Sequence, residues 1–261
     1  MIYIAFLLFT FLVLVFVFYQ WQYFMVFTPV YYRDKDLDDR YQILTLFTDD
    51  DVELEGVVYE PENFSDTILF FAGRNHDVVG VIEKLSYVYE NCRIVTFNYR
   101  SYGKSGGVAT EKMLLSDALK IAEVVEKNYG EFYLLGFSLG TSMATYVASK
   151  HNAKALFLIG AFDSIPSLAR EKYLGKTRFF DVDISRFLRY KFDTVTYLKS
   201  VTCKTYIFVS KDDEIIYLKN ARRLKESASN LTYYHEYSSL SHKELFWDKN
   251  VTDTIKGFIG C

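Results

Sequence analysis

Two segments of the chain hold a serine between two glycines in the pattern Gly-x-Ser-x-Gly. One runs from Gly103 to Gly107 and the other from Gly136 to Gly140. A serine in this pattern sits on a tight strand-to-helix turn, where closely packed backbone requires glycine on both sides. The start of the helix then offers a backbone N–H to an oxyanion. The pattern therefore indicates a nucleophilic serine that carries out acyl transfer.

Only the second copy has the local context that such a turn requires. The apolar run FYLLG (132–136) leads directly into it, and Leu139, Met143 and Val147 then recur on one helical face. We therefore predict Ser138 as the nucleophile.

The first copy lacks that context. Ser105 lies several residues beyond the preceding apolar run, and two consecutive glycines follow it, which disfavours a helix. The same loop, NYRSYGKS (98–105), nearly spells a phosphate-binding loop, but Asn98 stands in place of its first glycine. We interpret Ser105 as a solvated loop serine and exclude a phosphate site.

A serine hydroxyl becomes a good nucleophile only when an imidazole accepts its proton and a carboxylate orients that imidazole. After a serine on this kind of turn, the acid and then the histidine follow along the chain. His76 and His151 come too early or end a helix, and His235 lies within an apolar strand pattern. His242 follows that last strand and opens a helix, so we predict it as the base.

The acid is expected after the apolar run TYIFVS (205–210). Asp212, Asp213 and Glu214 all stand there, and such a charge run is usually a solvated turn in which one carboxylate has a special role. The spacing from the strand favours Asp213. The second oxyanion donor is expected in the loop after TILFFA (67–72), where the N–H of Arg74 joins that of Leu139 as a candidate.

The elements around these residues alternate between strand and helix patterns. Two alternating segments open the series as an antiparallel hairpin, and nearly continuous apolar runs typical of buried parallel strands follow. The alternation predicts a mostly parallel sheet with helices on both faces. The hairpin spans 41–48 and 52–59, the further strands 67–72, 93–97, 132–136, 155–160, 205–210 and 231–237, and the helices 78–90, 111–128, 139–150, 215–227 and 243–258.

The first part of the chain is typical of a membrane span. From Ile2 to Tyr19 no side chain is charged, and in a helix this stretch covers roughly 27 Å, close to a hydrocarbon core. A cleaved signal peptide would need a basic start and a small-residue cleavage site, and neither is present. We predict an anchor at 1–27, a linker at 28–40 and a catalytic domain at 41–261. The stretch 161–200 breaks the alternation and is predicted to form a small lid.

The flanks of the span favour a catalytic domain on the cytoplasmic side. Arg33, Lys35 and Arg40 follow the apolar stretch, whereas no basic side chain precedes it. A net charge of −3 gives no basic face for nucleic acid. The three cysteines show no metal-site or disulfide-framework spacing, and Cys92 and Cys203 are interpreted as buried thiols.

Four segments together resemble the α/β-hydrolase superfamily, and within it the small-lid, membrane-anchored serine hydrolases related to protein depalmitoylases. They are FNYRSYGKSGG (97–107), LLGFSLG (134–140), YKFDTVTYLKSVTCKTYIFVSKDDEII (190–216) and SHKEL (241–245). The resemblance covers about 41–258 and implies the α/β-hydrolase fold. It also assigns the acid to Asp213 and the base to His242, and it treats the loop 98–105 as a structural signature.

The chain departs from the pattern of these relatives at the oxyanion loop, where Ala72-Gly73-Arg74 replaces His-Gly-Asn. A backbone N–H can still donate after that change, whereas the loop geometry and the charge of the pocket can differ. Ser210 and Ser241 replace glycines that flank the acid and base segments.

The sequence thus predicts a serine hydrolase of carboxylic esters or thioesters that uses no cofactor or metal. Its expected substrate is an acylated small molecule, lipid or protein, and the sequence does not determine its oligomeric state. Two alternatives stay open: a peptidase or amidase of the same fold, and a non-catalytic, membrane-anchored binding module.

Overall fold

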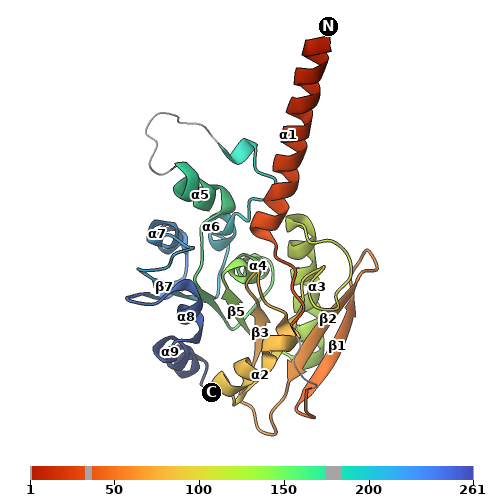
Figure 1. The fold of residues 1–261 in the computed structure, drawn as a ribbon. Coiled ribbons are helices and arrows are strands. Elements are labelled where there is room, and N and C mark those ends of the chain that lie inside the picture. The colour runs from red at the N-terminus through yellow and green to blue at the C-terminus, as the bar shows by residue number, and fades with distance from the viewer. Residues whose placement is uncertain (1, 33–36, 175–183, 261) are drawn as a thin grey trace.

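The computed structural model describes residues 2–32, 37–174 and 184–260. Within them the strands form one eight-stranded sheet of order β1-β2-β4-β3-β5-β6-β7-β8 (Figure 1). The strands are β1 (Tyr41–Phe47), β2 (Glu53–Tyr59), β3 (Asp66–Phe71), β4 (Cys92–Phe97), β5 (Tyr133–Phe137), β6 (Ala155–Ile159), β7 (Lys204–Ser210) and β8 (Leu231–Tyr237).

The pairing directions match the predicted architecture. β1 pairs with β2 antiparallel, from Tyr41 opposite Tyr59 to Phe47 opposite Glu53, and β2 pairs antiparallel with β4. The pairings from β4 through β3, β5, β6 and β7 to β8 are parallel. The carboxyl ends of β5, β7 and β8 therefore lie at one edge of the sheet, which brings together the loops that carry the predicted catalytic residues.

The helices between the strands begin and end close to the predicted limits, with one exception. The sequence predicts a single helix over 243–258, whereas two helices meet at Asp248, whose carboxylate accepts from the N–H groups of Asn250 and Val251 and starts the second. The helices that cover the sheet are α2 (Val78–Val88), α3 (Glu111–Tyr129), α4 (Leu139–Ala148), α7 (Leu218–Ser227), α8 (His242–Trp247) and α9 (Lys249–Ile259).

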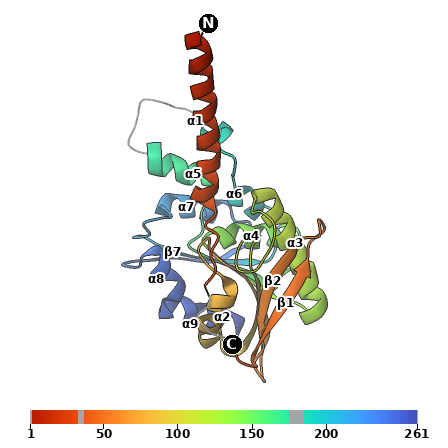
Figure 2. The same cartoon turned by 45° about the vertical axis from the view of Figure 1, so that its right-hand side comes forward.

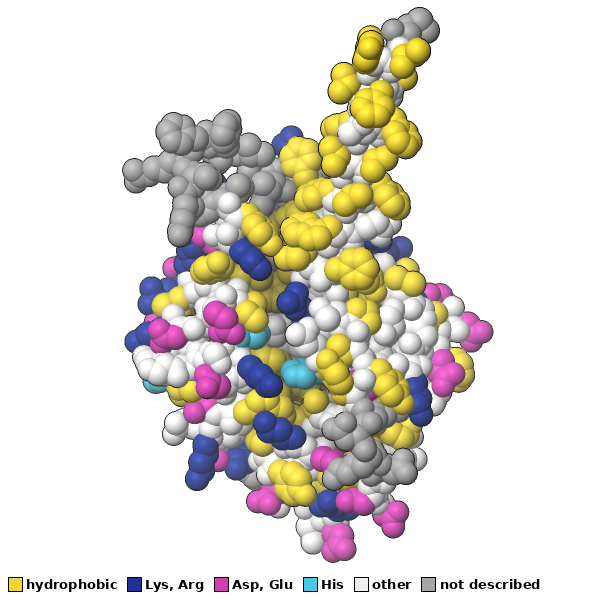
Figure 3. All heavy atoms as spheres, in the orientation of Figure 1, with side chains coloured by type: hydrophobic (Ala, Val, Ile, Leu, Met, Phe, Trp, Pro, Cys, Tyr) yellow, Lys and Arg dark blue, Asp and Glu magenta, His cyan; other side chains and the backbone are white. Residues whose placement is uncertain are grey.

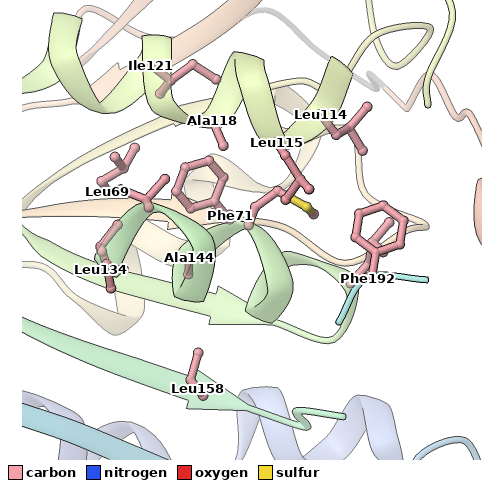
Figure 4. Packing of buried hydrophobic residues seen from close by; sticks show 14 of the residues in the cluster. Leu69, Phe71, Leu114, Leu115, Ala118, Ile121, Leu134, Ala144, Leu158 and Phe192 are labelled. Atoms are coloured by element: carbon pink, nitrogen blue, oxygen red, sulfur yellow. The ribbon is translucent and has the colours of Figure 1, made fainter. Parts of the chain in front are cut away.

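Alternate residues of the buried strands face two separate cores. In β3, Leu69 and Phe71 belong to the core under α3 and α4, whereas Ile68 and Phe70 belong to the core under α2, α8 and α9. Figure 4 shows the first core, where Leu69 and Phe71 meet Leu134 and the helical residue Ala144. Burial of each such large apolar side chain contributes about 1.5–3 kcal/mol, so both faces of the sheet stabilise it.

Helix α1 (Ile2–Val26) projects away from the domain (Figures 1 and 2). Its side chains from Ile2 to Tyr19 are exposed and form an apolar coat (Figure 3). An uncharged window of this helix has a mean hydropathy of 2.7 and none of its residues is buried. By length and composition, α1 is able to cross a membrane.

The base of α1 and the residues after it pack on the domain. Val26 and Phe27 belong to the core under α3 and α4. Thr28 N–H donates to the Tyr102 hydroxyl, and Tyr32 N–H donates to Asp77. The proposed division into an anchor at 1–27 and a linker at 28–40 stays a prediction, but the described part of that linker lies against the domain.

The predicted lid at 161–200 lies between β6 and β7, and its residues 175–183 fall outside the described residues. The described part forms four short helical segments. α5 and α6 lie close to the base of α1 in both views (Figures 1 and 2). The segments are α5 (Ile165–Ala169), the π-helical η1 (Arg170–Leu174), the 3₁₀-helical η2 (Ile184–Arg186) and α6 (Thr194–Leu198).

Both cysteines differ in part from their interpretation as buried thiols. Cys92 is fully buried at the start of β4, as expected, but it is disulfide-bonded rather than a free thiol. Cys203 is a half-buried free thiol, and burial raises its pKa to about 11.

Candidate active site

Ser138 stands on the turn between β5 and α4 with φ 52° and ψ −120°. A side chain at either flanking glycine would collide with backbone. A Cβ on Gly140 would lie 2.0 Å from the carbonyl oxygen of Phe71, and one on Gly136 would lie 2.8 Å from that of Gly140. The two glycines thus permit the strained turn that presents the hydroxyl at the sheet edge.

Ser105 has a structural role instead. It is buried rather than solvated, which corrects the expectation from the sequence. Its hydroxyl donates to the carbonyl of Asn98 and accepts from the N–H of Glu55, so it ties the signature loop to β2. The Asn98 amide also donates to Asp77 and accepts from Val78 N–H, which fixes the start of α2.

His242 lies against Ser138 at the first position of α8. The Ser138 hydroxyl is 2.8 Å from Nε2, and the Asp213 carboxylate is 2.7 Å from Nδ1. Both the imidazole and the carboxylate are almost fully buried. Because a carboxylate only accepts, Nδ1 carries a hydrogen and Nε2 is left to accept the serine proton. The Phe137 ring stacks on the imidazole at 5.0 Å between centroids and holds its orientation.

The three acidic residues after β7 each bind a different N–H group. Asp213 holds the imidazole ring with one oxygen, while the other accepts from two backbone N–H groups of its own turn. Glu214 accepts from the backbone N–H of His242, and Asp212 accepts from that of Ser239. The sequence favoured Asp213 but assigned no role to its neighbours, which fix the loop that carries the histidine.

The loop after β3 lies beside Ser138, as the oxyanion prediction requires. A Cβ on Gly73 would be 3.4 Å from the Cβ of Ser138. The Arg74 guanidinium points elsewhere: it donates to the carbonyl of Met25 at the end of α1, with a separation of 2.5 Å. The side chain of Arg74 therefore places its charge at the base of α1, while its role as a backbone oxyanion donor stays a prediction.

The sequence did not single out His76 as part of this site. Its ring packs at a tilt against both Phe137 and Phe246, with centroid distances of 5.7 and 6.1 Å, and its Nδ1 is buried without a hydrogen-bond partner among the described residues. Burial, with smaller contributions from the nearby Lys243 and His242, lowers the pKa of His76 to about 4. The imidazole is therefore neutral at physiological pH, and it packs against Phe137, whose ring stacks on His242. The sequence gives no local sign of this role, because the rings that pack against His76 belong to distant segments of the chain.

Across residues 2–32, 37–174 and 184–260, no three His, Cys, Asp or Glu side chains gather as a group that could hold a metal ion. A mostly parallel sheet that presents such a serine on a strand-to-helix turn, with the acid and histidine after later strands, defines the α/β-hydrolase class.

Comparison with known proteins agrees with that class. The model of the alpha/beta hydrolase fold family matches residues 66–250, and the chain belongs to this family. The lysophosphatidylserine lipase ABHD12 of Gallus gallus is 24% identical over 204 residues, covering 69% of this chain and 52% of that protein. An uncharacterized protein, R595, of Acanthamoeba polyphaga mimivirus is 25% identical, covering 72% and 69%. The chain spans about half the length of the ABHD12 relatives it matches.

Solved structures show the same fold. The esterase Pf2001 of Pyrococcus furiosus superimposes with a TM-score of 0.67 at 14% identity, covering 90% of this chain and 97% of that one. Est1E of Butyrivibrio proteoclasticus, determined with ferulic acid bound, gives a TM-score of 0.65 at 17% identity and covers 83% and 97%.

Proposed function

We propose that the chain is a membrane-anchored serine hydrolase that cleaves carboxylic ester or thioester bonds through an acyl-enzyme on Ser138. The observation that carries the proposal is the buried line of hydrogen bonds from Asp213 through His242 to Ser138. Membership of the alpha/beta hydrolase fold family supports it independently.

In this mechanism the Ser138 oxygen attacks the carbonyl carbon while its proton passes to Nε2 of His242. Asp213 holds Nδ1–H and stabilises the imidazolium that forms. The N–H groups of Arg74 and Leu139 donate to the oxyanion. The intermediate then expels the alcohol or thiol, which takes the proton from Nε2. Water attacks the acyl-enzyme with His242 again as base, and the acid leaves as the serine regains its proton.

A lipid ester is the substrate class that the relatives and the anchor favour. The similar proteins of known activity are named as a lysophosphatidylserine lipase and as esterases. An apolar helix at the N-terminal end of the domain would keep the active site near acyl chains in a membrane. A panel of acyl esters and acyl thioesters of increasing chain length tests this, since a preference for short soluble esters would contradict it.

A fluorophosphonate probe tests the nucleophile directly. The full chain should become labelled, and Ser138→Ala should abolish labelling, whereas Ser105→Ala should not. Turnover of an ester should fall by at least about 10⁴-fold in Ser138→Ala. Folded protein that takes no label would instead be the non-catalytic binding module, and labelling that persists in Ser138→Ala would show another nucleophile.

Two observations bear on the side of the membrane, and they point in opposite directions. The cations Arg33, Lys35 and Arg40 after the span favour a cytoplasmic catalytic domain. The disulfide at Cys92 is typical of compartments outside the cytosol. Protease treatment of sealed vesicles of known orientation decides between them: digestion of the domain in cytosolic-side-out vesicles places it in the cytoplasm, and protection places it on the opposite side.

A further inference from the structure

Two exposed aromatic side chains of the lid lie beside the base of α1. Tyr173 is 50% exposed and Phe187 is 66% exposed. The ring of Tyr173 is 6.2 Å from that of Trp21, and the carbonyl of Phe187 accepts from the side chain of Gln22 at 3.2 Å. Apolar lid surface is thus placed next to the helix that would enter the membrane, as the hydrophobic side chains around the base of α1 in Figure 3 illustrate.

Hydrogen bonds fix the position of residues 187–189 of the predicted lid along the axis of α1. Gln22 is only 4% exposed, and its carbonyl oxygen accepts from the N–H of Arg189 at 2.6 Å. The Arg189 guanidinium lies over the ring of Tyr19 at 4.3 Å. With its amide bonded to residues 187 and 189, Gln22 holds this part of the lid level with the last turns of the helix.

That level corresponds to the membrane interface. The uncharged side chains of α1 are exposed up to Trp21, and the buried Gln22 follows, so the membrane-spanning part of the helix ends close to Trp21, where an amphipathic ring favours the interface. At about 1.5 Å per residue, the segment from Gln22 to Val26 then extends roughly 6 Å into the headgroup region. Phe187, bonded to Gln22, lies at the same depth.

The chemistry of these side chains fits that depth. Aromatic rings with an exposed edge favour the interface, and cations there attract anionic headgroups. Lys172 lies over the ring of Tyr173, so one cation and one ring stand together at this level, as Arg189 and Tyr19 do.

We propose that this lid face is a second membrane-contact surface whose partner is the lipid bilayer. It consists of Trp21, Tyr173 and Phe187 with Lys172 and Arg189. The inference rests on the proposed membrane anchor and extends it: the catalytic domain lies against the bilayer on a defined side and does not hang from a flexible tether. A lipid ester would then enter the active site from the headgroup level.

Single tryptophans report the contact in the full chain. The native tryptophans are Trp21 and Trp247, so both are replaced by phenylalanine. Phe187→Trp then reports the lid face and Phe9→Trp reports the span. Tyr87→Trp is the matched control, because Tyr87 is 72% exposed on α2, away from the apolar part of α1 (Figures 1 and 2). Each protein is reconstituted into phosphatidylcholine–phosphatidylserine vesicles whose acyl chains carry bromine, a contact quencher, near the headgroup end or near the methyl end.

Bromine near the headgroup should cause a loss of fluorescence at position 187 and none at position 87, and bromine near the methyl end should quench position 9. Quenching at 9 without quenching at 187 overturns the lid contact and leaves the anchor intact. No quenching at 9 overturns the anchor itself. Quenching at 87 as strong as at 187 shows that the domain lies on another face, which also overturns the inference.

A rate ratio provides a second readout. Phe187→Ser should lower the rate on a long-chain ester embedded in vesicles, relative to the rate on a short soluble ester, by about ten-fold, since it removes one interfacial aromatic ring. Tyr87→Ser should leave the ratio unchanged. A ratio that Phe187→Ser also leaves unchanged overturns the proposal.

Discussion

Among the three acidic residues after β7, only Asp213 bonds to the imidazole ring of His242. Asp212 and Glu214 accept from the backbone N–H groups of Ser239 and His242. A neutral amide oxygen is an adequate acceptor for a backbone N–H. A neutral amide that replaces the carboxylate beside the imidazole cannot stabilise the imidazolium, and its N–H can impose the wrong tautomer on the histidine. The three positions should therefore respond differently to the same isosteric change.

Asp213→Asn should lower kcat/KM for an ester by about 10⁴-fold while the protein stays folded. Asp212→Asn is the matched control and should retain nearly full activity, because its amide oxygen still accepts from Ser239 N–H. Steady-state kinetics with thermal unfolding as a folding check measures both. Equal losses in the two variants would contradict the assignment of the acid.

His76 makes the stability of the fold depend on pH. Burial lowers the pKa of His76 to about 4, whereas an unfolded histidine titrates near 6.5. Between these values the unfolded chain binds more protons, so stability is complete above pH 6.5 and is lost as the pH falls towards 4. The loss amounts to at most about 3–4 kcal/mol, since each pKa unit corresponds to about 1.4 kcal/mol.

His76→Phe should remove this dependence, because an aromatic ring still packs against Phe137 and Phe246 but carries no titrating nitrogen. The unfolding temperature of the variant should fall less between pH 7.5 and pH 5 than that of the natural chain. Parallel falls in both proteins would show that His76 does not titrate as the structure indicates.

At the scale of elements, the turn between β5 and α4 depends on backbone crowding. Gly140 begins the first turn of α4 directly against the carbonyl of Phe71 at the end of β3. The same close approach brings the loop after β3 next to Ser138, where the N–H of Arg74 is proposed to donate. The close approach that lets α4 pack against β3 is therefore also needed to place the proposed oxyanion donors.

Gly140→Ala should lower the unfolding temperature sharply and reduce fluorophosphonate labelling, since its methyl group would meet backbone that cannot rotate away. Gly257→Ala is the control. Gly257 lies within α9 with open space around it, and alanine there should stabilise the helix by about 1 kcal/mol. An alanine at 140 that is tolerated as well as one at 257 would contradict the crowding described for the turn.

At the scale of the whole molecule, the last turns of the apolar helix α1 pack into the catalytic domain. The exposed part of α1 contributes nothing to the core, whereas Gln22, Val26 and Phe27 are buried at its base. The functional boundary between the proposed anchor and the domain should therefore fall within α1, on the N-terminal side of Gln22.

Two truncations test that boundary. A chain that begins at Gln20 should fold, hydrolyse a soluble ester at a nearly normal rate and appear in the soluble fraction after cell lysis. A chain that begins at Thr28 loses the contacts of Gln22, Val26 and Phe27 and should unfold at a clearly lower temperature. Equal unfolding temperatures would show that the base of α1 is only a tether.

Local patterns in the sequence determined much of this protein. Continuous apolar runs predicted the buried strands and hence the parallel sheet, and Gly136-Phe137-Ser138-Leu139-Gly140 identified the turn because strand, glycines and helix are neighbours in the chain. The order of serine, acid and histidine located His242. The uncharged stretch after Ile2 predicted α1. Each of these depends on residues within one or two elements.

Only the tertiary structure decided features that join distant segments. It showed that Asp213 faces the imidazole while Glu214 binds the backbone, that Ser105 is buried against β2, and that the Arg74 side chain reaches Met25. It also showed that the Gln22 side chain bonds to the backbone of Phe187 and Arg189. Composition and spacing cannot distinguish neighbouring carboxylates or place a long side chain, because the choice depends on which hydrogen-bonding groups the folded chain brings within about 3 Å.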